Sequence, residues 1–344
     1  MSADPLLAIE DLRVGFRTDD GLVQAVRGLS LQVAPGGALG IVGESGSGKS
    51  VAMLTVLGLT RGPNAEIAGE IRFEGRDLVG ARESELRAVR GRRIAMIFQD
   101  PQSSMHPFYR VGRQLVEALK AHQTMTRTAA RERAVELLAL VGIPEPRRRV
   151  DAYPHEYSGG MRQRAMIAMA LANDPELLIA DEPTTALDVT VQAQILDLLA
   201  RLREELGMAL VLLTHDLGVV AQVTDEIAVM YAGEVVERGS REAILTAPEH
   251  PYTWGLLRSI PRLDRPRGEE LVPIAGSPPS LLAPPSGCAF HPRCPYVREA
   301  HRRVHPQLDP APGAVVHDVR CLLPATTRMR LWRELAAPAE GGAR

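Results

Sequence analysis

The chain has 344 residues, a size that fits one large domain with a smaller appendage. Hydrophobic residues make up 45% of it and charged residues 24%, which is the usage of globular proteins and not of disordered chains. The formal net charge is -2, whereas proteins that hold nucleic acid on a broad basic surface carry a surplus of Lys and Arg. The composition therefore disfavours nucleic acid as a partner.

No apolar run is long enough to cross a membrane, because runs such as residues 209–213 fall far below the ~18 to 20 residues needed. The first five residues, Met1 to Pro5, also lack the basic start and apolar run of a secretory signal. We therefore expect the chain in the cytosol, with any membrane contact made through partner proteins.

Short apolar runs alternate with helical patterns over the first ~245 residues, which is typical of an α/β domain with a largely parallel sheet. Their continuous apolar character fits strands that are covered on both faces. The predicted strands are residues 39–42, 94–98, 177–180 and 209–213.

The strand signals stop between Gln99 and about Asp174, where helical periodicity predicts an all-helical insertion. A further amphipathic helix is predicted after Asp188, with Gly207 as its end. After Pro248 the composition shifts to Pro, Gly and Arg, which precludes long helices and indicates a second, smaller module.

A glycine-rich segment directly after the first predicted strand and before a helix matches the pattern G-x-x-x-x-G-K-[ST]. Such a pattern arises by chance in roughly one chain in a hundred of this length. Backbone N–H groups of this segment can surround a phosphate, the lysine adds a positive charge for the outer phosphates, and the last serine can bind Mg²⁺. The predicted nucleotide-binding residues are Gly43, Glu44, Ser45, Gly46, Ser47, Gly48, Lys49 and Ser50.

Two adjacent carboxylates, Asp181 and Glu182, follow the strand predicted at 177–180. Ligands gather at the carboxyl ends of strands in open parallel sheets. Alone, such a pair is more often a solvated turn, but downstream of a phosphate loop we predict that Asp181 binds Mg²⁺. We predict that Glu182 orients and deprotonates the attacking water.

The segment Tyr157-Ser-Gly-Gly-Met161 resembles the signature motif of ABC (ATP-binding cassette) ATPases. It precedes an apolar helix, so its N–H groups and the positive helix end suit an anion, although a plain helix cap explains Ser158 equally well. The resemblance implies that this cap acts on ATP held by a partner subunit. The residues concerned are Ser158, Gly159, Gly160 and Met161.

Three further elements match the same family in order: Gln99, the run Ala186-Leu187-Asp188, and His215. The resemblance implies that Gln99 contacts Mg²⁺ and the water, that Asp188 bridges paired ATPases, and that His215 contacts the γ-phosphate. It also implies that Phe16 stacks on adenine, although this family usually has a tyrosine there and a core position is the alternative.

The fold implied by this resemblance is an ABC-type P-loop NTPase: an α/β, RecA-like and mostly parallel sheet with an antiparallel β subdomain and a helical subdomain. The nucleotide-binding domain is expected over residues 1–260, with the helical subdomain at about 100–174. A small irregular C-terminal domain is expected over 261–325, and a partly disordered tail over 326–344.

Two later segments, Tyr231 to Gly239 and His250 to Leu257, resemble the oligopeptide/dipeptide/nickel importer ATPases, of the D type. This resemblance implies transport-coupled ATP hydrolysis that energises di- or oligopeptide uptake, with ATP and Mg²⁺ as cofactors. It also implies a second homologous ATPase, giving a heterodimer, two transmembrane permeases and an extracytoplasmic peptide-binding protein. The chain would then be a peripheral protein on the cytoplasmic face of the cell membrane.

Cys288, Cys294 and Cys321 are similar to a cysteine motif that binds a 4Fe-4S cluster in some of these importers. The family pattern has four cysteines, and His301 stands where the third would fall. A Cys₃His set suits an iron–sulfur cluster or a tetrahedral zinc ion, and inert buried thiols are the third alternative.

Two alternatives to peptide import stay open at this point. The same subunit could serve nickel or another small solute, because an ATPase of this kind has no cargo pocket. A soluble ABC ATPase of DNA repair or translation is the alternative from another class. It is disfavoured by the single cassette, the lack of heptads and the lack of basic excess.

Overall fold

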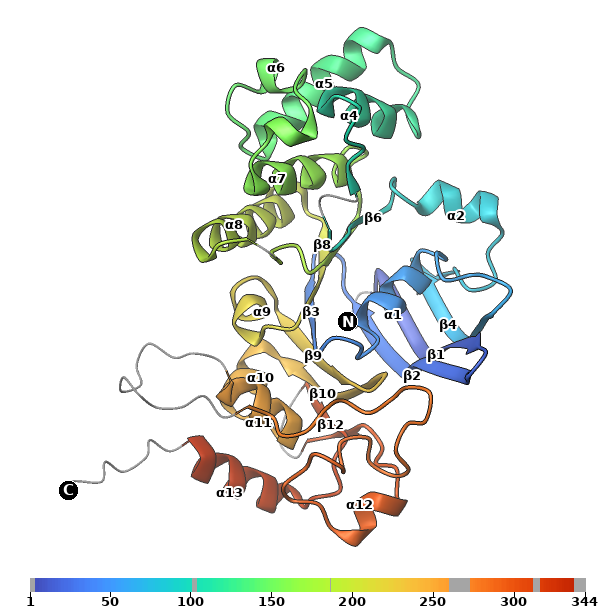
Figure 1. Ribbon diagram of the computed structural model, residues 1–344, viewed down its shortest axis with the longest axis vertical. Helices are drawn as coiled ribbons and strands as arrows, with labels where there is room; N and C mark the ends of the chain where they lie inside the picture. The colour runs from blue at the N-terminus through green and yellow to red at the C-terminus, as the bar shows by residue number, and fades with distance from the viewer. Residues whose placement is uncertain (1–3, 101–103, 186, 260–272, 312–315, 337–344) are drawn as a thin grey trace, which may run out of the picture.

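The computed structural model describes residues 4–100, 104–185, 187–259, 273–311 and 316–336. Within them, a central sheet carries a helical subdomain at one end, an antiparallel β subdomain beside it and a C-terminal module at the other end (Figure 1). This architecture confirms the α/β fold class expected from the sequence.

The central sheet has eight strands in the described residues, in the order β11-β12-β10-β9-β3-β8-β7-β6. The five strands from β9 to β6 pair in parallel, whereas β10, β12 and β11 extend the sheet with antiparallel pairs. The strands are β3 (Ala38–Val42), β6 (Ile94–Ile97), β7 (Leu177–Asp181), β8 (Ala209–Thr214), β9 (Glu226–Tyr231), β10 (Glu234–Ser240), β11 (Asp309–Pro310) and β12 (His317–Val319). All four strands predicted from the sequence are present.

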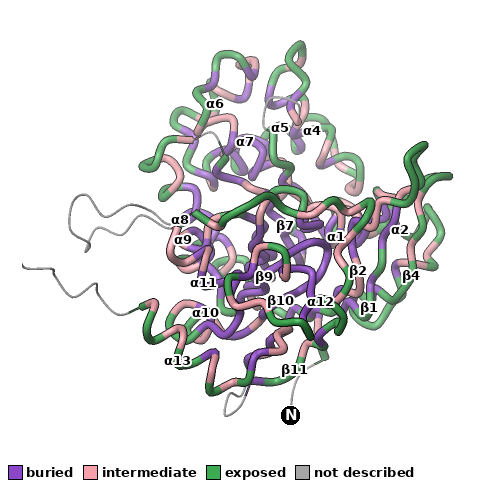
Figure 2. Tube along the Cα trace, turned by 60° about the horizontal axis from the view of Figure 1, so that its bottom comes forward, coloured by how far each residue is buried: buried purple, intermediate pink, exposed green. Residues whose placement is uncertain are grey.

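Hydrophobic cores lie on both faces of this sheet. On β7, Leu178 and Ala180 belong to one buried cluster, whereas Leu177 and Ile179 belong to the other. Because neighbouring side chains on a strand point to opposite faces, a strand between two cores is apolar throughout. Figure 2 shows the strands of this sheet as mostly buried.

The antiparallel subdomain is a second sheet, in the order β2-β1-β4-β5. It packs against the core that also contains Ile41 and Met53, so it covers the sheet face next to the first helix. Its strands are β1 (Leu7–Thr18), β2 (Gly21–Val33), β4 (Ala65–Phe73) and β5 (Arg76–Asp77).

The segment between β6 and β7 is helical in its described residues, as the sequence predicted, and stands apart at the top of Figure 1. Its elements are α4 (Val111–Lys120), α5 (Arg127–Leu140), α6 (Pro146–Arg149), the short 3-10 helix η1 (Pro154–Glu156) and α7 (Gly159–Ala170). Apolar residues of α4, α5 and α7 belong to the cluster that continues onto the sheet. The helical subdomain is thus joined to the sheet by one core.

The remaining helices lie around the sheet and in the C-terminal module. The helix predicted after Asp188 is α8, and Gly207 ends it with a φ of 64°. Among the described residues these helices are α1 (Lys49–Val56), α2 (Glu83–Val89), α8 (Val189–Leu206), α9 (Leu217–Val223), α10 (Arg241–Thr246), α11 (Pro251–Arg258), α12 (Glu299–Arg303) and α13 (Ala325–Ala336). Part of the expected tail is therefore helical, and residues 337–344 lie outside the described residues.

The C-terminal module is built into the main sheet through β12, which pairs with the edge strand β10. The Glu237 side chain of β10 is fully buried and accepts hydrogen bonds from the Glu249 and His250 amides, and its Oε1 lies 2.8 Å from His317 Nε2 on β12. In the same module, Arg328 of α13 pairs with Glu249, and both side chains are 8% exposed. The module thus shares buried polar contacts with the cassette.

The buried pair of His317 and Glu237 gives a prediction about pH and stability. Burial lowers the pKa of His317, but the Glu237 carboxylate outweighs this and raises the net pKa above the ordinary 6.5. A histidine with a raised folded-state pKa stabilises the fold below the unfolded pKa, and this contribution is lost as pH rises through the folded pKa.

His317→Gln should therefore lower the free energy of unfolding more at about pH 6 than at about pH 9. Urea unfolding of the two proteins at both pH values measures this difference. An equal loss at both pH values would contradict a charged His317.

Candidate functional site

The carboxyl ends of the parallel strands lie side by side, because the strands are held in register. Val42 of β3 pairs with Thr214 of β8, and Asp181 of β7 pairs with Leu213. Two hydrogen bonds continue this register into the loops, from the Gly43 amide to the Thr214 carbonyl (3.3 Å) and from the Glu182 amide to the Leu213 carbonyl (2.9 Å). The site residues that were predicted after separate strands therefore lie together at the carboxyl edge of the parallel sheet.

The loop between β3 and α1 adopts a shape that its glycines make possible. A Cβ on Gly43 would lie 2.2 Å from the Met230 carbonyl oxygen, and one on Gly48 would lie 2.3 Å from the Ala25 carbonyl oxygen. Gly48 also has a φ of 100°, which side chains rarely permit. Only glycine therefore fits at these two positions, because any side chain would collide with a neighbouring carbonyl oxygen.

Lys49 lies inside this loop and is 5% exposed. Its Nζ donates to the carbonyl oxygens of Gly43 (2.6 Å) and Glu44 (3.1 Å). Burial lowers the pKa of Lys49, and the nearby carboxylates of Glu182 and Asp181 oppose that shift. A buried ammonium among loop N–H groups suits the charged oxygens of a nucleotide phosphate.

Asp181 ends β7 beside this lysine and is 5% exposed. Burial raises the pKa of Asp181, and a hydrogen bond with Ser50 opposes the shift. Its Oδ1 is buried with no hydrogen-bond partner. An unpartnered carboxylate oxygen next to a serine hydroxyl fits the hard oxygen donors that Mg²⁺ prefers.

Glu182 is the residue on which the other predicted side chains converge. Its backbone has a φ of 46°, which is uncommon for a residue other than glycine. Its Oε2 accepts from Gln99 Nε2 and from Thr185 Oγ1, both at 2.9 Å. His215 Nδ1 lies 3.3 Å from its Oε1. Gln99, Glu182 and His215 follow three different strands, and the structure brings them together.

The protonation state of Glu182 suits a general base. Burial alone would raise the pKa of Glu182, but hydrogen bonds with Thr185 and His215 outweigh it and lower the net pKa below its ordinary value. The carboxylate is therefore ionised near neutral pH and can accept a proton from water. The His215 side chain is 61% exposed, so it faces the solvent from which a nucleotide would arrive.

The signature residues are not in hydrogen-bond contact with the phosphate loop of the same chain in the contacts described. Ser158 begins α7, and its Oγ accepts from the Met161 amide at 3.3 Å. Ser158 and Gly159 are exposed, and a Cβ on Gly160 would lie 2.7 Å from a methyl carbon of Val191. The helix cap foreseen from the sequence is present, with its N-terminal end facing solvent.

Asp188 and Phe16 each have structural partners within the chain. Asp188 begins α8, where its Oδ1 accepts from the Val191 amide at 2.9 Å; Ala186 lies outside the described residues. Phe16 lies on β1, partly buried against the core of the antiparallel subdomain. Stacking of Phe16 on adenine and bridging by Asp188 stay predictions.

The Cys-rich segment offers a partial fit to a metal centre. Cys288, Cys294 and His301 are buried, and the Nε2 atom of His301 has no hydrogen-bond partner. Burial raises the pKa of all three thiols, that of Cys294 to about 11 and that of Cys321 to about 12. Among the residues that the structure describes, however, no three His, Cys, Asp or Glu side chains are gathered to hold a metal ion.

Three residues that the sequence did not assign to the site contact it. Thr185 donates to Glu182, the Tyr252 hydroxyl accepts from the Glu44 amide at 3.0 Å, and Arg293 pairs with the Glu44 carboxylate. Thr185 is close enough in sequence to Glu182 to be suspected. Tyr252 and Arg293 are separated from Glu44 by more than half of the chain, so only the fold reveals them.

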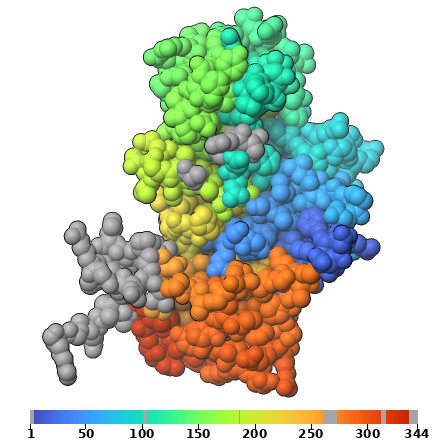
Figure 3. Space-filling view, in the orientation of Figure 1, coloured from blue at the N-terminus to red at the C-terminus, as the bar shows by residue number. Residues whose placement is uncertain are grey.

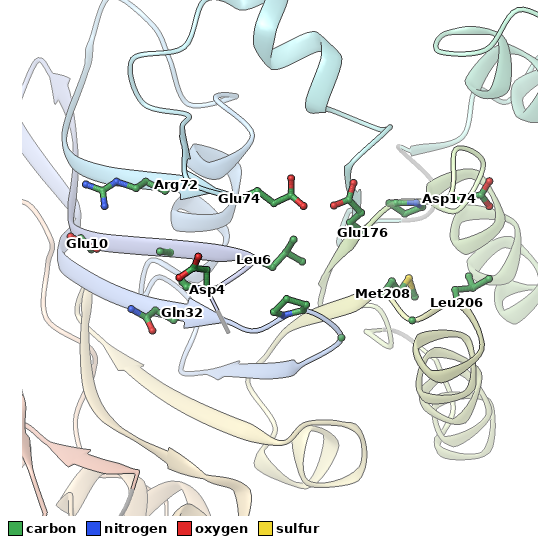
Figure 4. A pocket seen from close by; sticks show the side chains of 17 residues that line it. Asp4, Leu6, Glu10, Gln32, Arg72, Glu74, Asp174, Glu176, Leu206 and Met208 are labelled. Carbon is green, nitrogen blue, oxygen red and sulfur yellow. The ribbon is translucent and has the colours of Figure 1, made fainter. Parts of the chain in front are cut away.

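A cavity of about 770 Å³ lies apart from these catalytic candidates (Figure 4). It is lined by residues that precede β3, β7 and β8, including Gly36, Glu176 and Met208. It therefore lies at the amino ends of the parallel strands, whereas the catalytic candidates lie at the carboxyl ends. Ligand sites in parallel sheets are found at the carboxyl ends.

A phosphate loop, a buried lysine and two carboxylates at the end of the neighbouring strand define the site of a P-loop nucleoside triphosphatase. Comparisons with known proteins specify the family. The ABC transporter family matches residues 26–185, and the family described as the oligopeptide/dipeptide transporter C-terminal region matches residues 236–300.

Curated relatives are similar over most of their length. The oligopeptide transport ATP-binding protein OppD of Bacillus subtilis is 54% identical, with 85% of this chain and 82% of the relative covered. The dipeptide transport ATP-binding protein DppD of the same organism is 51% identical, with 88% and 90% covered. OppD of Escherichia coli is 50% identical, with 90% and 92% covered.

Solved structures show the same fold. The ATP-binding cassette MJ0796, described as a dimer in a post-hydrolysis state bound to ADP and Pi, has a TM-score of 0.61 at 29% identity. The match covers 68% of this chain and 98% of that one. The chain belongs to the ABC transporter ATP-binding proteins that carry the oligopeptide/dipeptide transporter C-terminal region, and it is an ATPase. These findings favour the transport reading over a soluble ATPase of DNA repair or translation.

The position of Glu182 gives a prediction about catalysis. Glu182→Gln keeps the size of the side chain but removes the proton acceptor, so ATP binding should persist while turnover falls about 10² to 10⁴-fold. Nucleotide binding and single-turnover hydrolysis by the assembled complex measure the two effects. Thr185→Val is a milder control that removes one hydrogen bond to the carboxylate, and undiminished hydrolysis by Glu182→Gln would exclude this residue as the base.

Proposed function

We propose that this chain is the ATP-hydrolysing subunit of an importer that takes up di- and oligopeptides across the cytoplasmic membrane. The observation that carries the proposal is the convergence of Gln99, Thr185 and His215 on Glu182 beside the phosphate loop. The substrate class is supported by the names of the relatives and by the match of the C-terminal region.

In this proposal, each residue of the site has a role that its position supports. Lys49 and the N–H groups of the phosphate loop bind the nucleotide phosphates. Asp181, Ser50 and Gln99 would hold Mg²⁺, which neutralises phosphate charge when it is bound. Glu182 orients and deprotonates the water, and the exposed His215 contacts the γ-phosphate.

The signature residues act, in this proposal, on ATP held by a second subunit. The exposed N-terminal end of α7 at Ser158 supports this, because its free N–H groups and helix dipole attract an anion. A nucleotide that contacts two subunits binds the closed dimer better than the open one, and its hydrolysis removes that preference. Asp188 would lie at the same interface.

The complete assembly would contain a second, homologous ATPase, two transmembrane permeases and an extracytoplasmic peptide-binding protein. No helix among the described residues is long and apolar enough to cross a membrane. Because the relatives are named as transport ATP-binding proteins, the proposal places this chain on the cytoplasmic face as a peripheral subunit whose closing and opening drive the permeases.

The transport proposal predicts the behaviour of the reconstituted complex. Peptide-loaded binding protein should raise the ATPase rate and drive peptide uptake into vesicles, because cargo arrival favours the closed dimer. Glu182→Gln should abolish uptake. Nickel uptake without peptide uptake would show that the cargo is nickel and not peptide. Isolation of the chain on DNA or ribosomes with no permease would overturn the transport role.

A 4Fe-4S cluster or a zinc ion on Cys288, Cys294, His301 and Cys321 remains a hypothesis, supported by the buried, unpartnered Nε2 of His301. A bound metal would deprotonate the thiols, whose pKa values burial otherwise raises. Iron, sulfide and zinc analysis of anaerobically purified protein tests it. Stoichiometric iron and sulfide, lost in Cys288→Ser, would support the cluster; stoichiometric zinc would support the ion, and the absence of all three would leave inert thiols.

A further inference from the structure

An ion pair between a buried arginine side chain and a partly exposed glutamate joins the C-terminal module to the phosphate loop. The Arg293 side chain is 4% exposed and that of Glu44 is 27% exposed. The two terminal nitrogens of Arg293 donate to the two carboxylate oxygens of Glu44 at 2.6 and 3.0 Å. Glu44 is the second residue of the phosphate loop. Such a two-bond contact between arginine and a carboxylate fixes geometry as well as charge.

The same arginine is held firmly by its own module. Its Nε donates to the Ala275 carbonyl at 2.9 Å, and a terminal nitrogen donates to the Ile274 carbonyl at 3.2 Å. Its amide donates to the Phe290 carbonyl within the turn between Cys288 and Cys294. The Nε and both terminal nitrogens of Arg293 thus each have a hydrogen-bond acceptor, which fixes the orientation of the guanidinium group beside Glu44.

Glu44 is also tied on its backbone. Its amide donates to the Tyr252 hydroxyl, and its carbonyl accepts from Lys49 Nζ. Tyr252, Tyr231 and Phe290 form a ring cluster beneath this contact, with centroids 4.7 to 5.5 Å apart. In the space-filling view, the C-terminal module (orange) lies directly against the N-terminal segment (blue) (Figure 3).

We propose that Arg293 is a positioning residue for ATP binding: through the Glu44 carboxylate it holds the start of the phosphate loop in the shape that receives the nucleotide. The C-terminal module then contributes to the nucleotide site, in addition to distinguishing this group of transporter ATPases. The inference rests on ATP binding by this loop and is independent of the transported solute.

The test compares variants of the full chain in the assembled complex. Arg293→Ala should raise the KM for ATP about tenfold with kcat changed less than about twofold, because Lys49 and Glu182 keep their places. A non-hydrolysable ATP analogue should show the same loss in its Kd. Arg293→Lys should restore part of the affinity, since lysine keeps the charge but not the second bond.

Two further variants separate positioning from general stability. Glu44→Gln should raise the KM for ATP as Arg293→Ala does, and the double variant should be no worse than the worse single one, because both remove the same contact. Arg328→Ala is the matched control: it breaks the buried pair of Arg328 with Glu249, and the side-chain hydrogen bonds described for Arg328 go to Glu249 and Leu323, outside the phosphate loop. It should lower the Tm while leaving the KM for ATP unchanged.

The outcomes are distinct. If Arg293→Ala lowers only the Tm, as Arg328→Ala does, or if the effects of Arg293→Ala and Glu44→Gln add fully, the positioning role is wrong. If the wild-type chain itself fails to bind the ATP analogue, the assignment of the nucleotide site fails instead.

Discussion

The parallel register of β3, β8, β7 and β6 is the constraint on which the site depends. Residues of the site follow each strand just past its carboxyl end. These residues can act on one nucleotide only if the strand ends lie side by side. The bonds from the Gly43 amide to Thr214 and from the Glu182 amide to Leu213 extend that level edge into the loops. Cores on both faces of the sheet prevent a slip of register, because a shift of one residue would exchange the two sets of apolar side chains.

This edge places two neighbouring carboxylates in different environments. Asp181 is buried with one oxygen unpartnered, and burial raises its pKa, whereas Glu182 is surrounded by hydrogen-bond donors that lower its pKa. Adjacent acids with opposite shifts can divide binding and proton transfer between them. The buried Lys49 lies near both carboxylates, and its positive charge offsets the cost of placing two negative charges there.

The sequence predicted the parts of this site that are encoded locally. The phosphate loop, the strand ending in Asp181 and the cap at Ser158 each fit within a dozen residues, so spacing and residue type suffice to predict them. The convergence of Gln99, His215 and Thr185 on one carboxylate required the sheet register, which no short pattern records. The pairing of β12 with β10, and the contacts of Tyr252 and Arg293 with Glu44, join segments far apart in the chain. The gathering of Cys288, Cys294, His301 and Cys321 into a ligand set was expected from a motif, and it is not seen among the described residues.

The contacts of Glu44 also bear on the order in which the protein is made. The partners of Glu44 follow it by 208 residues at Tyr252 and by 249 residues at Arg293. A ribosome that has released the phosphate loop has therefore not yet synthesised the groups that hold its first residues. Since chains fold as they emerge, from the N-terminus onward, the nascent cassette completes its nucleotide site only when the C-terminal module docks.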